Sequence, residues 1–225
     1  MDLRLFTTGV ICTNTYCFLD GEKSFSFMDP GGNGKELVEY VKSQNGVISS
    51  VLLTHGHYDH IAGIRCMVEA FPNIKIYVHG DDAYRLGENA FDVAYREFVQ
   101  LGIGEVVDNN DFPIPPGDVL LKDGDVILKG SPTFPDGLQV VSTPGHSPGS
   151  VCFFSAEKNI MFTGDTIFAQ GSCGRIDCEG GDGEKLKTSL ERILSFPDDV
   201  EILPGHGPAS LLKTEKKFRS SLFSF

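Results

Sequence analysis

Five of the six histidines in this chain lie in short motifs beside aspartate or glycine. The densest motif, residues 54–60, reads Thr-His-Gly-His-Tyr-Asp-His and places three histidines and one aspartate within seven residues. Imidazole and carboxylate groups are the usual ligands of zinc and neighbouring transition metals, and bare histidines contribute little to a hydrophobic core. The residue types and their spacing therefore predict a metal site.

Three later motifs add one candidate ligand each, and in each of them the ligand follows a glycine. They are Pro-Gly-His at 144–146, Thr-Gly-Asp at 163–165 and Pro-Gly-His at 204–206. Singly, such residues could be turn residues or helix caps. Their joint occurrence favours one site with ligands for two metal ions. The seven candidates are His55, His57, Asp59, His60, His146, Asp165 and His206.

Strands must bring these motifs together, because they are far apart along the chain. Short β-branched and leucine-rich runs at 48–53, 138–142, 160–163 and 200–203 each precede a motif and predict strands. Ligands on loops at strand ends are positioned by a rigid sheet. In extended chain His55 and His57 can point the same way, while a helix over 61–71 would redirect Asp59 and His60. One motif can thus serve two metals.

Other segments complete a strand-rich pattern with interspersed helices. Further strands are predicted at 3–7, 15–19, 24–28, 75–78, 125–129 and 151–155, and further helices at 35–44, 184–194 and 211–218. The segment 87–117 contains a helical apolar stripe followed by a proline-rich loop. We expect its helix to cover the core, and a lid over the active site is the alternative. His79 belongs to no motif, and we expect it to be structural or to lie on the rim of the site.

Composition limits the class of protein. The chain has 225 residues, 40% of them hydrophobic, which is enough for the core of one domain spanning 1–225. Its 19 basic and 31 acidic residues give a net charge of -12, which disfavours nucleic acid as a partner. No apolar run approaches the about 18 residues of a membrane span, and the N-terminus does not resemble a signal peptide. We therefore expect a cytoplasmic protein with free thiols and no membrane partner; no pattern indicates an oligomeric state.

The motifs together resemble the metallo-β-lactamase superfamily, and within it the glyoxalase II branch, the hydroxyacylglutathione hydrolases. The resemblance implies a mixed α/β (α+β) fold, a four-layer αββα sandwich with its site at the edge between the sheets. The segments that carry it are 29–32, 55–60, 143–149, 164–168, 171–175 and 203–208.

The resemblance also divides the ligands into two sets. One consists of His55, His57 and His146, the other of Asp59, His60 and His206, and Asp165 would bridge them. The implied cofactors are two divalent metal ions, zinc first, with iron or manganese as alternatives. Two such cations acidify a shared water to hydroxide near neutral pH. The predicted function is hydrolysis of a small-molecule thioester of the hydroxyacylglutathione type by that hydroxide.

Roles follow for residues in and around the predicted site. Asp59 and Asp165 are the expected catalytic carboxylates. Arg175 is expected to contact a substrate carboxylate, and Cys173 to lie close to the substrate. The residues expected to hydrogen-bond ligand histidines and fix their tautomers are Asp29, Thr54 and Thr143.

Two departures from the branch leave the substrate open. Only 19 residues follow His206, so we expect a short form without the C-terminal helical domain of long-form members. Asp177 stands where an aromatic glutathione contact is expected. Two alternatives are a persulfide dioxygenase with one iron, held at positions matching His55, His146 and Asp165, and a lactonase or other ester hydrolase. Metal content and a thioester panel separate them.

Overall fold

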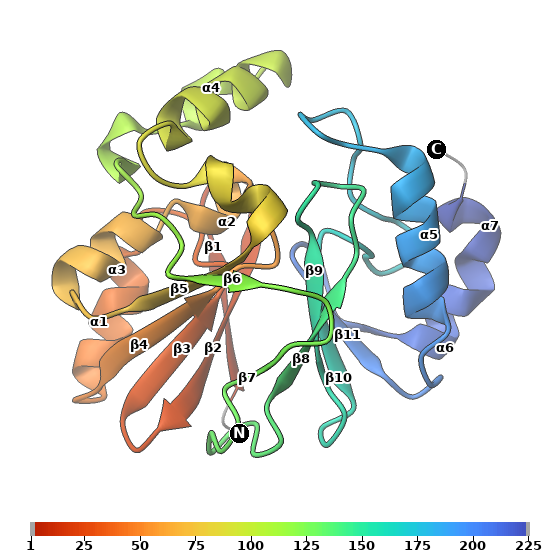
Figure 1. The fold of residues 1–225 in the computed structure, drawn as a ribbon, viewed down its shortest axis with the longest axis horizontal. Coiled ribbons are helices and arrows are strands. Elements are labelled where there is room, and N and C mark those ends of the chain that lie inside the picture. The colour runs from red at the N-terminus through yellow and green to blue at the C-terminus, as the bar shows by residue number, and fades with distance from the viewer. Residues whose placement is uncertain (1–2, 224–225) are drawn as a thin grey trace.

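Two mixed β-sheets pack face to face in the computed structural model, which describes residues 3–223, and helices cover both outer faces (Figure 1). The first sheet contains, in spatial order, β1 (Leu3–Thr8), β2 (Thr13–Gly21), β3 (Ser24–Met28), β4 (Val47–Leu52), β5 (Lys75–His79) and β6 (Val119–Leu121). The second contains β12 (Ser210–Leu211), β11 (Glu201–Pro204), β10 (Ile160–Gly164), β9 (Val151–Ser155), β8 (Leu138–Ser142) and β7 (Val126–Ile127).

Helices connect the parallel strands. β3 through β6 run parallel to one another, as do β10 and β11, and the other pairs are antiparallel. Parallel neighbours need a crossover, which packs on the sheet face. The first sheet is accompanied by α1 (Lys35–Ser43), α2 (Tyr58–Ile61), α3 (Ile64–Ala70) and α4 (Ala90–Gln100). The second is covered by α5 (Gly183–Leu194), α6 (Leu212–Glu215) and α7 (Arg219–Leu222).

Three buried clusters fill the three spaces between the four layers, because successive side chains of a strand point to opposite faces. In β2, Cys17 faces the cluster shared with α1 and α3, whereas Tyr16 and Phe18 join the cluster between the sheets. In β10, Phe162 faces the space between the sheets and Met161 faces the cluster under α5. The predicted four-layer αββα sandwich is confirmed.

Several predicted boundaries were wrong. The helix expected over 61–71 is divided into α2 and α3 at Gly63, whose backbone N–H donates to the Pro30 carbonyl at 2.8 Å. The helix expected over 211–218 is divided into α6, a 3₁₀ turn (Lys216–Phe218) and α7. The strand expected at 125–129 is only the short β7. Strand β6 was not predicted, since three residues after a proline-rich loop carry no periodic signal.

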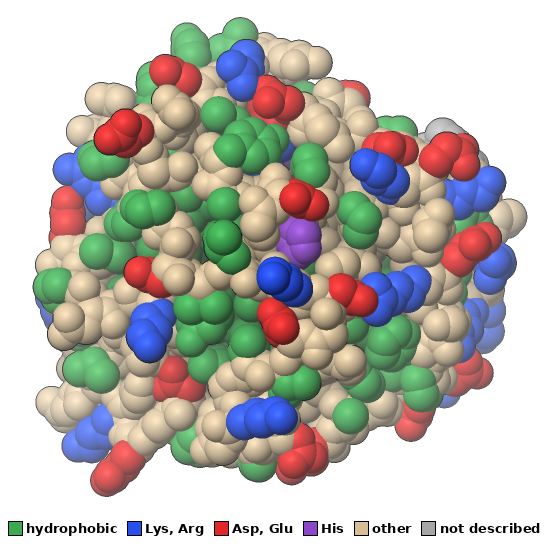
Figure 2. Space-filling view, viewed as in Figure 1, with side chains coloured by type: hydrophobic (Ala, Val, Ile, Leu, Met, Phe, Trp, Pro, Cys, Tyr) green, Lys and Arg blue, Asp and Glu red, His purple; other side chains and the backbone are tan. Residues whose placement is uncertain are grey.

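The segment 87–117 covers the core as expected. In α4, Ala90, Ala94 and Phe98 are buried in the cluster beneath the first sheet's helices. The six cysteines carry free thiols. No helix within residues 3–223 combines the length and apolar character that a bilayer crossing requires. On the face shown in Figure 2, lysines and arginines are dispersed among acidic side chains and form no basic patch.

The cluster between the sheets generates a stability prediction. Phe162 is fully buried, and its ring lies 5.1 Å from that of Tyr16 and 6.0 Å from that of Phe134. Phe162→Ala leaves a cavity and should lower the free energy of unfolding by about 3–5 kcal/mol. Leu5→Ala is the control, because Leu5 is 52% exposed and should cost less than about 0.5 kcal/mol. Urea denaturation measures both, and equal losses would contradict a core that depends on sheet-to-sheet packing.

Candidate metal centre

All seven candidate ligands lie just beyond the carboxyl ends of four strands. His55 and His57 follow β4, and Asp59 and His60 lie in the adjoining short helix α2. The other three, His146, Asp165 and His206, follow β8, β10 and β11.

Backbone hydrogen bonds join these loops across the two sheets. The Val151 N–H donates to the Thr54 carbonyl at 2.8 Å, which connects the first motif to the second sheet. The Gly205 N–H donates to the Gly164 carbonyl at 2.7 Å, which connects the loops that carry Asp165 and His206. Segments far apart in sequence therefore meet at one edge of the sandwich.

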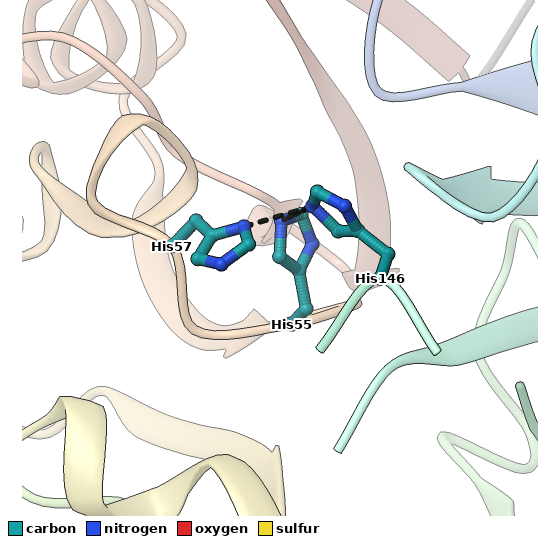
Figure 3. Close-up of side chains that lie close together, drawn as sticks. All are labelled: His55, His57 and His146. Carbon is teal, nitrogen blue, oxygen red and sulfur yellow. Dashed lines mark hydrogen bonds between the residues drawn. The ribbon is translucent and has the colours of Figure 1, made fainter. Parts of the chain in front are cut away.

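The first ligand set is a cluster of three imidazoles that point at one another (Figure 3). His146 Nε2 lies 2.8 Å from His57 Nδ1 and 3.2 Å from His55 Nε2. All three side chains are buried. Nitrogen ligands of a tetrahedral zinc stand about 3.3 Å apart when each bond is about 2.0–2.1 Å. The cluster is therefore of the right size to surround one metal ion.

Hydrogen bonds on the far side of two rings determine which nitrogen has a free lone pair. The His146 Nδ1–H donates to the Arg175 carbonyl at 2.6 Å, so in the neutral ring the lone pair lies on Nε2. The Thr54 hydroxyl donates its proton to Asp29 Oδ2 at 2.6 Å, so at 3.0 Å it can only accept from the His55 Nδ1–H. The Nε2 lone pairs of His55 and His146 consequently face each other and repel unless a cation lies between them.

The second set adjoins the first and contains carboxylates. Asp59 Oδ2 lies 3.2 Å from His60 Nε2 and 3.2 Å from His206 Nε2. Asp29 Oδ2 lies 3.1 Å behind the His60 ring, at Nδ1, and the Cys12 carbonyl lies 3.3 Å from His206 Nδ1. These partners again direct the Nε2 atoms toward a common point.

Asp165 contacts both sets. Its Oδ1 lies 3.5 Å from His60 Nε2, and its Oδ2 lies 3.5 Å from His146 Nε2 and 3.6 Å from His206 Nε2. Within residues 3–223, the buried atoms His60 Nε2 and Asp165 Oδ1 have no hydrogen-bond partner. Buried polar atoms are normally paired, so this arrangement fits a second cation that Asp165 shares with the first.

The electrostatics of the two sets differ. Burial, and then the neighbouring imidazoles, lower the pKa of His55 and His57 well below the usual value. Burial opposes charge at His60 and His206 as well, but the surrounding carboxylates outweigh it and raise the pKa of both. Burial would raise the pKa of Asp59, yet His60 and His206 hold it well below the usual range. His55 and His57 of the first set thus favour the neutral form, whereas His60 and His206 of the second favour the protonated form when no metal is present.

Close approaches explain the glycine beside His206. A Cβ at Gly205 would lie 2.3 Å from Asp165 Oδ1 and 2.7 Å from His60 Cε1. No side chain fits there without displacing the Asp165 carboxylate.

Asp82 is a supporting residue that the sequence analysis missed. It is fully buried and accepts hydrogen bonds from the Gly56 N–H at 2.8 Å, the Ser147 hydroxyl at 2.7 Å and the Gly149 N–H at 2.6 Å. The carboxylate therefore joins the loop of His55 and His57 to the loop of His146. No motif marks it, because its neighbours in the sequence, Asp81 and Ala83, are unremarkable for a surface turn.

A buried arginine lies beside Asp82. Arg85 is 1% exposed, its Nε lies 3.9 Å from Asp82 Oδ1, and its side chain packs against Gly56. One guanidinium nitrogen donates to both carboxylate oxygens of Glu97 in α4 at 2.6 Å. This network connects the metal loops to α4 and was also not predicted. Another residue not predicted is Thr13, whose hydroxyl donates to Asp59 Oδ2 at 3.1 Å.

Some of the other predicted site residues contact the ligands or line the pocket, and others do not. Asp29 and Thr54 contact ligand histidines, as described above, but Thr143 does not: its hydroxyl lies 2.8 Å from that of Thr166. Cys173 packs against the cluster under α5, and Cys178 lines the pocket instead. The Arg175 side chain is paired with Asp177. His79 lies at the end of β5 and accepts from the Asp81 N–H at 3.3 Å, outside both ligand sets.

A pocket of about 410 Å³ opens over the ligands. One wall comes from the end of α4 and the turn after it, so the segment that covers the core also contributes to the site. Besides five of the ligands, the lining residues are Ile11, Glu97, Phe98, Leu101, Ile103, Phe168, Gly174, Arg175 and Cys178.

Comparison with known sequences identifies relatives along nearly the whole chain. The profile of the family described as "Metallo-beta-lactamase superfamily" matches residues 28–206. YqgX from Bacillus subtilis, named a probable metallo-hydrolase, is 32% identical over 218 residues, which are 96% of this chain and 95% of the relative. GloC from Haemophilus influenzae, named a hydroxyacylglutathione hydrolase, is 29% identical over 220 residues, 96% of each protein.

Solved structures show the same similarity. The crystal structure of the BLEG-1 B3 metallo-β-lactamase superposes with a TM-score of 0.78 at 30% identity and covers 98% of this chain and 99% of its own. The crystal structure of TTHA1623 in a di-iron-bound form superposes with a TM-score of 0.77 at 30% identity and covers 96% of this chain and 98% of its own.

The contrast in pKa between the two sets predicts that the binding of the second metal depends on pH. His55 and His57 favour the neutral form, so a metal need not displace a second ring proton from them, and the affinity of the first set should change less between pH 6 and 8 than that of the second. His60 and His206 bind protons that a metal must displace, so the affinity of the second set should rise with pH, by about tenfold per pH unit for each proton displaced.

Calorimetric titration of metal-free protein with Zn²⁺ measures this, in two buffers of different ionisation enthalpy at each pH. The second binding event should release more protons than the first. Equal proton release by the two binding events would contradict the predicted difference in protonation between the two ligand sets.

Asp82 provides a second prediction. Asparagine has the same shape, but it replaces one of two acceptor oxygens by an N–H₂ donor that would face another donor. Asp82→Asn should therefore loosen both metal loops and lower metal affinity about 10–100-fold. Asp81→Asn is the matched control, because its side chain is 69% exposed. Competition with a chromogenic chelator measures affinity, and a thermal melt of each sample detects loss of fold. Unchanged affinity in folded Asp82→Asn would show that the loops do not depend on this carboxylate.

Proposed function

The chain belongs to the metallo-β-lactamase superfamily, and from this premise we propose that it is a metal-dependent hydrolase that cleaves thioesters. Two divalent cations held by the adjoining ligand sets would acidify a water to serve as nucleophile and would polarise the scissile carbonyl. The 29% identity to GloC along 96% of both chains supports a thioester as the substrate class, to which hydroxyacylglutathiones also belong.

The observation that carries the proposal is that the described part of the pocket presents no unpaired group suited to act as a general acid for the leaving group. Apart from the metal ligands, its titratable residues are Glu97, Arg175 and Cys178. Both Glu97 oxygens accept from Arg85, Arg175 is paired with Asp177, and burial raises the pKa of Cys178 to about 11. Glu97 and Arg175 are paired and the Cys178 thiol is a weak acid, so a leaving group that departs without a proton is favoured.

This preference discriminates between substrates. A thiol has a pKa near 8.5, so its thiolate departs without a proton at neutral pH. An alkoxide from a lactone or other oxygen ester is far more basic and would need general-acid assistance. The pocket thus favours thioesters, and oxygen esters and β-lactams serve as comparison substrates.

The protein's own residues align the reaction. Thr13 fixes Asp59 from outside the pocket, and Asp59 in turn contacts two ligand histidines. The carbonyl of Arg175 orients His146, and the Thr54–Asp29 pair orients His55. Preorganised ligands of this kind lower the reorganisation needed when charge develops on the substrate oxygen.

A persulfide dioxygenase binds one iron and would need only some of these metal ligands. The second set, Asp59, His60 and His206, is complete, and its members lie within 4.8 Å of one another. The di-iron form of TTHA1623 also supports two metals.

The proposal predicts the effect of removing a ligand of the first set and of removing the carboxylate that contacts both sets. In metal-replete protein, His57→Ala and Asp165→Ala should each lower thioester turnover by at least about 100-fold, or about 2.7 kcal/mol of transition-state stabilisation. Turnover is measured on S-lactoylglutathione, with a lactone, a β-lactam and a persulfide with oxygen uptake in parallel. His79→Ala is the control, since this histidine lies outside both ligand sets.

Elemental analysis of the same samples gives the metal count. We expect two ions per chain in the wild type and one after His60→Ala. Wild-type protein that saturates at one iron and consumes oxygen with a persulfide would replace the hydrolase by the dioxygenase.

A further inference from the structure

We infer that the pocket selects thioesters whose groups are uncharged and apolar, and that Asp177 sets this preference by occupying Arg175. The inference rests on the proposed thioesterase function and specifies its substrate class.

Arg175 is the one lysine or arginine among the described residues that line the pocket. Its Nε donates to Asp177 Oδ1 at 2.6 Å, and a terminal nitrogen donates to Asp177 Oδ2 at 2.7 Å. These two bonds use the fork that would otherwise bind a substrate carboxylate.

Asp177 is a strong competitor for that fork. It is two residues away along the chain, so its effective concentration at Arg175 is on the order of millimolar or above. A substrate carboxylate would exchange one carboxylate for another and gain little. Because the side chains are 49% and 61% exposed, the pair itself is not a rigid core element and can be altered without loss of the fold.

The pocket's other charged wall residue does not favour anions either. Glu97 is 2% exposed, and both of its oxygens accept from Arg85 at 2.6 Å. Arg85 also donates to the Glu179 carbonyl at 2.7 Å, and it is not among the described residues that line the pocket. With a net charge of -12, the whole chain adds a field that opposes a negatively charged thiol such as glutathione.

Apolar side chains form what remains of the wall. Phe98, Leu101 and Ile103 come from the end of α4 and the turn after it, and Ile11 and Phe168 come from other loops. Each methylene that a substrate buries there should improve binding by about fourfold. A medium-length aliphatic acyl chain therefore fits this surface better than a hydroxyacyl group joined to a charged tripeptide.

Kinetics on three substrates test the inference in metal-replete protein. The substrates are hexanoyl-N-acetylcysteamine, acetyl-N-acetylcysteamine and S-lactoylglutathione. We expect kcat/KM for the hexanoyl thioester to exceed that for each of the others by about tenfold or more. Leu101→Ser should lower the ratio of hexanoyl to acetyl kcat/KM by about fivefold, because it removes apolar wall.

The variant Asp177→Asn tests whether Asp177 sets the substrate preference. Removing the competing carboxylate frees Arg175, so the ratio of kcat/KM for S-lactoylglutathione to that for the hexanoyl thioester should rise about tenfold, through a lower KM for the glutathione substrate. Adding Arg175→Gln should abolish the rise. Asp136→Asn is the matched control, because Asp136 is exposed and is not a pocket residue.

The possible failures are distinguishable. A wild-type preference for S-lactoylglutathione, or an unchanged ratio in Asp177→Asn, would overturn the inference and leave the thioesterase in place. Failure to hydrolyse any of the three thioesters with two metals bound would overturn the proposed function, and the inference with it.

Discussion

The structure depends on holding mutually repulsive ligand atoms together at one edge of the sandwich. His55 Nε2 and His146 Nε2 lie 3.2 Å apart with their lone pairs facing, because each ring uses its other nitrogen as a donor. A few ångström away, Asp59 and Asp165 carry carboxylates among buried imidazoles. Such a cluster is stable only with cations or with rigid support, since buried polar groups without partners are costly. Most of the surrounding architecture supplies that support.

Support comes from buried acceptors that bind more than one loop. Asp29 receives the Thr54 N–H and hydroxyl and also lies behind His60, so one carboxylate orients residues of both ligand sets. Asp82 joins the loops of His57 and His146, which both belong to the first set. A buried charge is costly unless it is paired, and Arg85 supplies the pairing next to Asp82. Because Arg85 also binds Glu97 in α4, the network that supports the ligands positions the pocket wall.

The pocket favours a narrower range of reactions than the fold permits. The same sandwich is found in the BLEG-1 β-lactamase and in TTHA1623, so architecture alone does not select a reaction. Under the proposed function, selection would come from the wall, where Glu97 and Arg175 are paired and apolar side chains remain for a substrate. Both features would favour a substrate with a good leaving group and little charge.

The sequence by itself determined the candidate ligands of a metal centre and the fold class. The spacing of His55, His57 and Asp59, and the glycines before His146 and His206, are local signals, because ligand type and turn conformation are properties of neighbouring residues. Hydrophobic runs before each motif likewise predicted the strands that carry them. The tertiary structure alone decided which residues support the ligands. Asp82 and Arg85 were not predicted, Thr143 does not contact a ligand, and Cys178 lines the pocket where Cys173 was expected. These outcomes depend on contacts between segments distant in the chain, such as Asp82 with Gly149 or Arg85 with Glu97. Residue type and spacing do not indicate such contacts, because the packing of the two sheets brings these segments together.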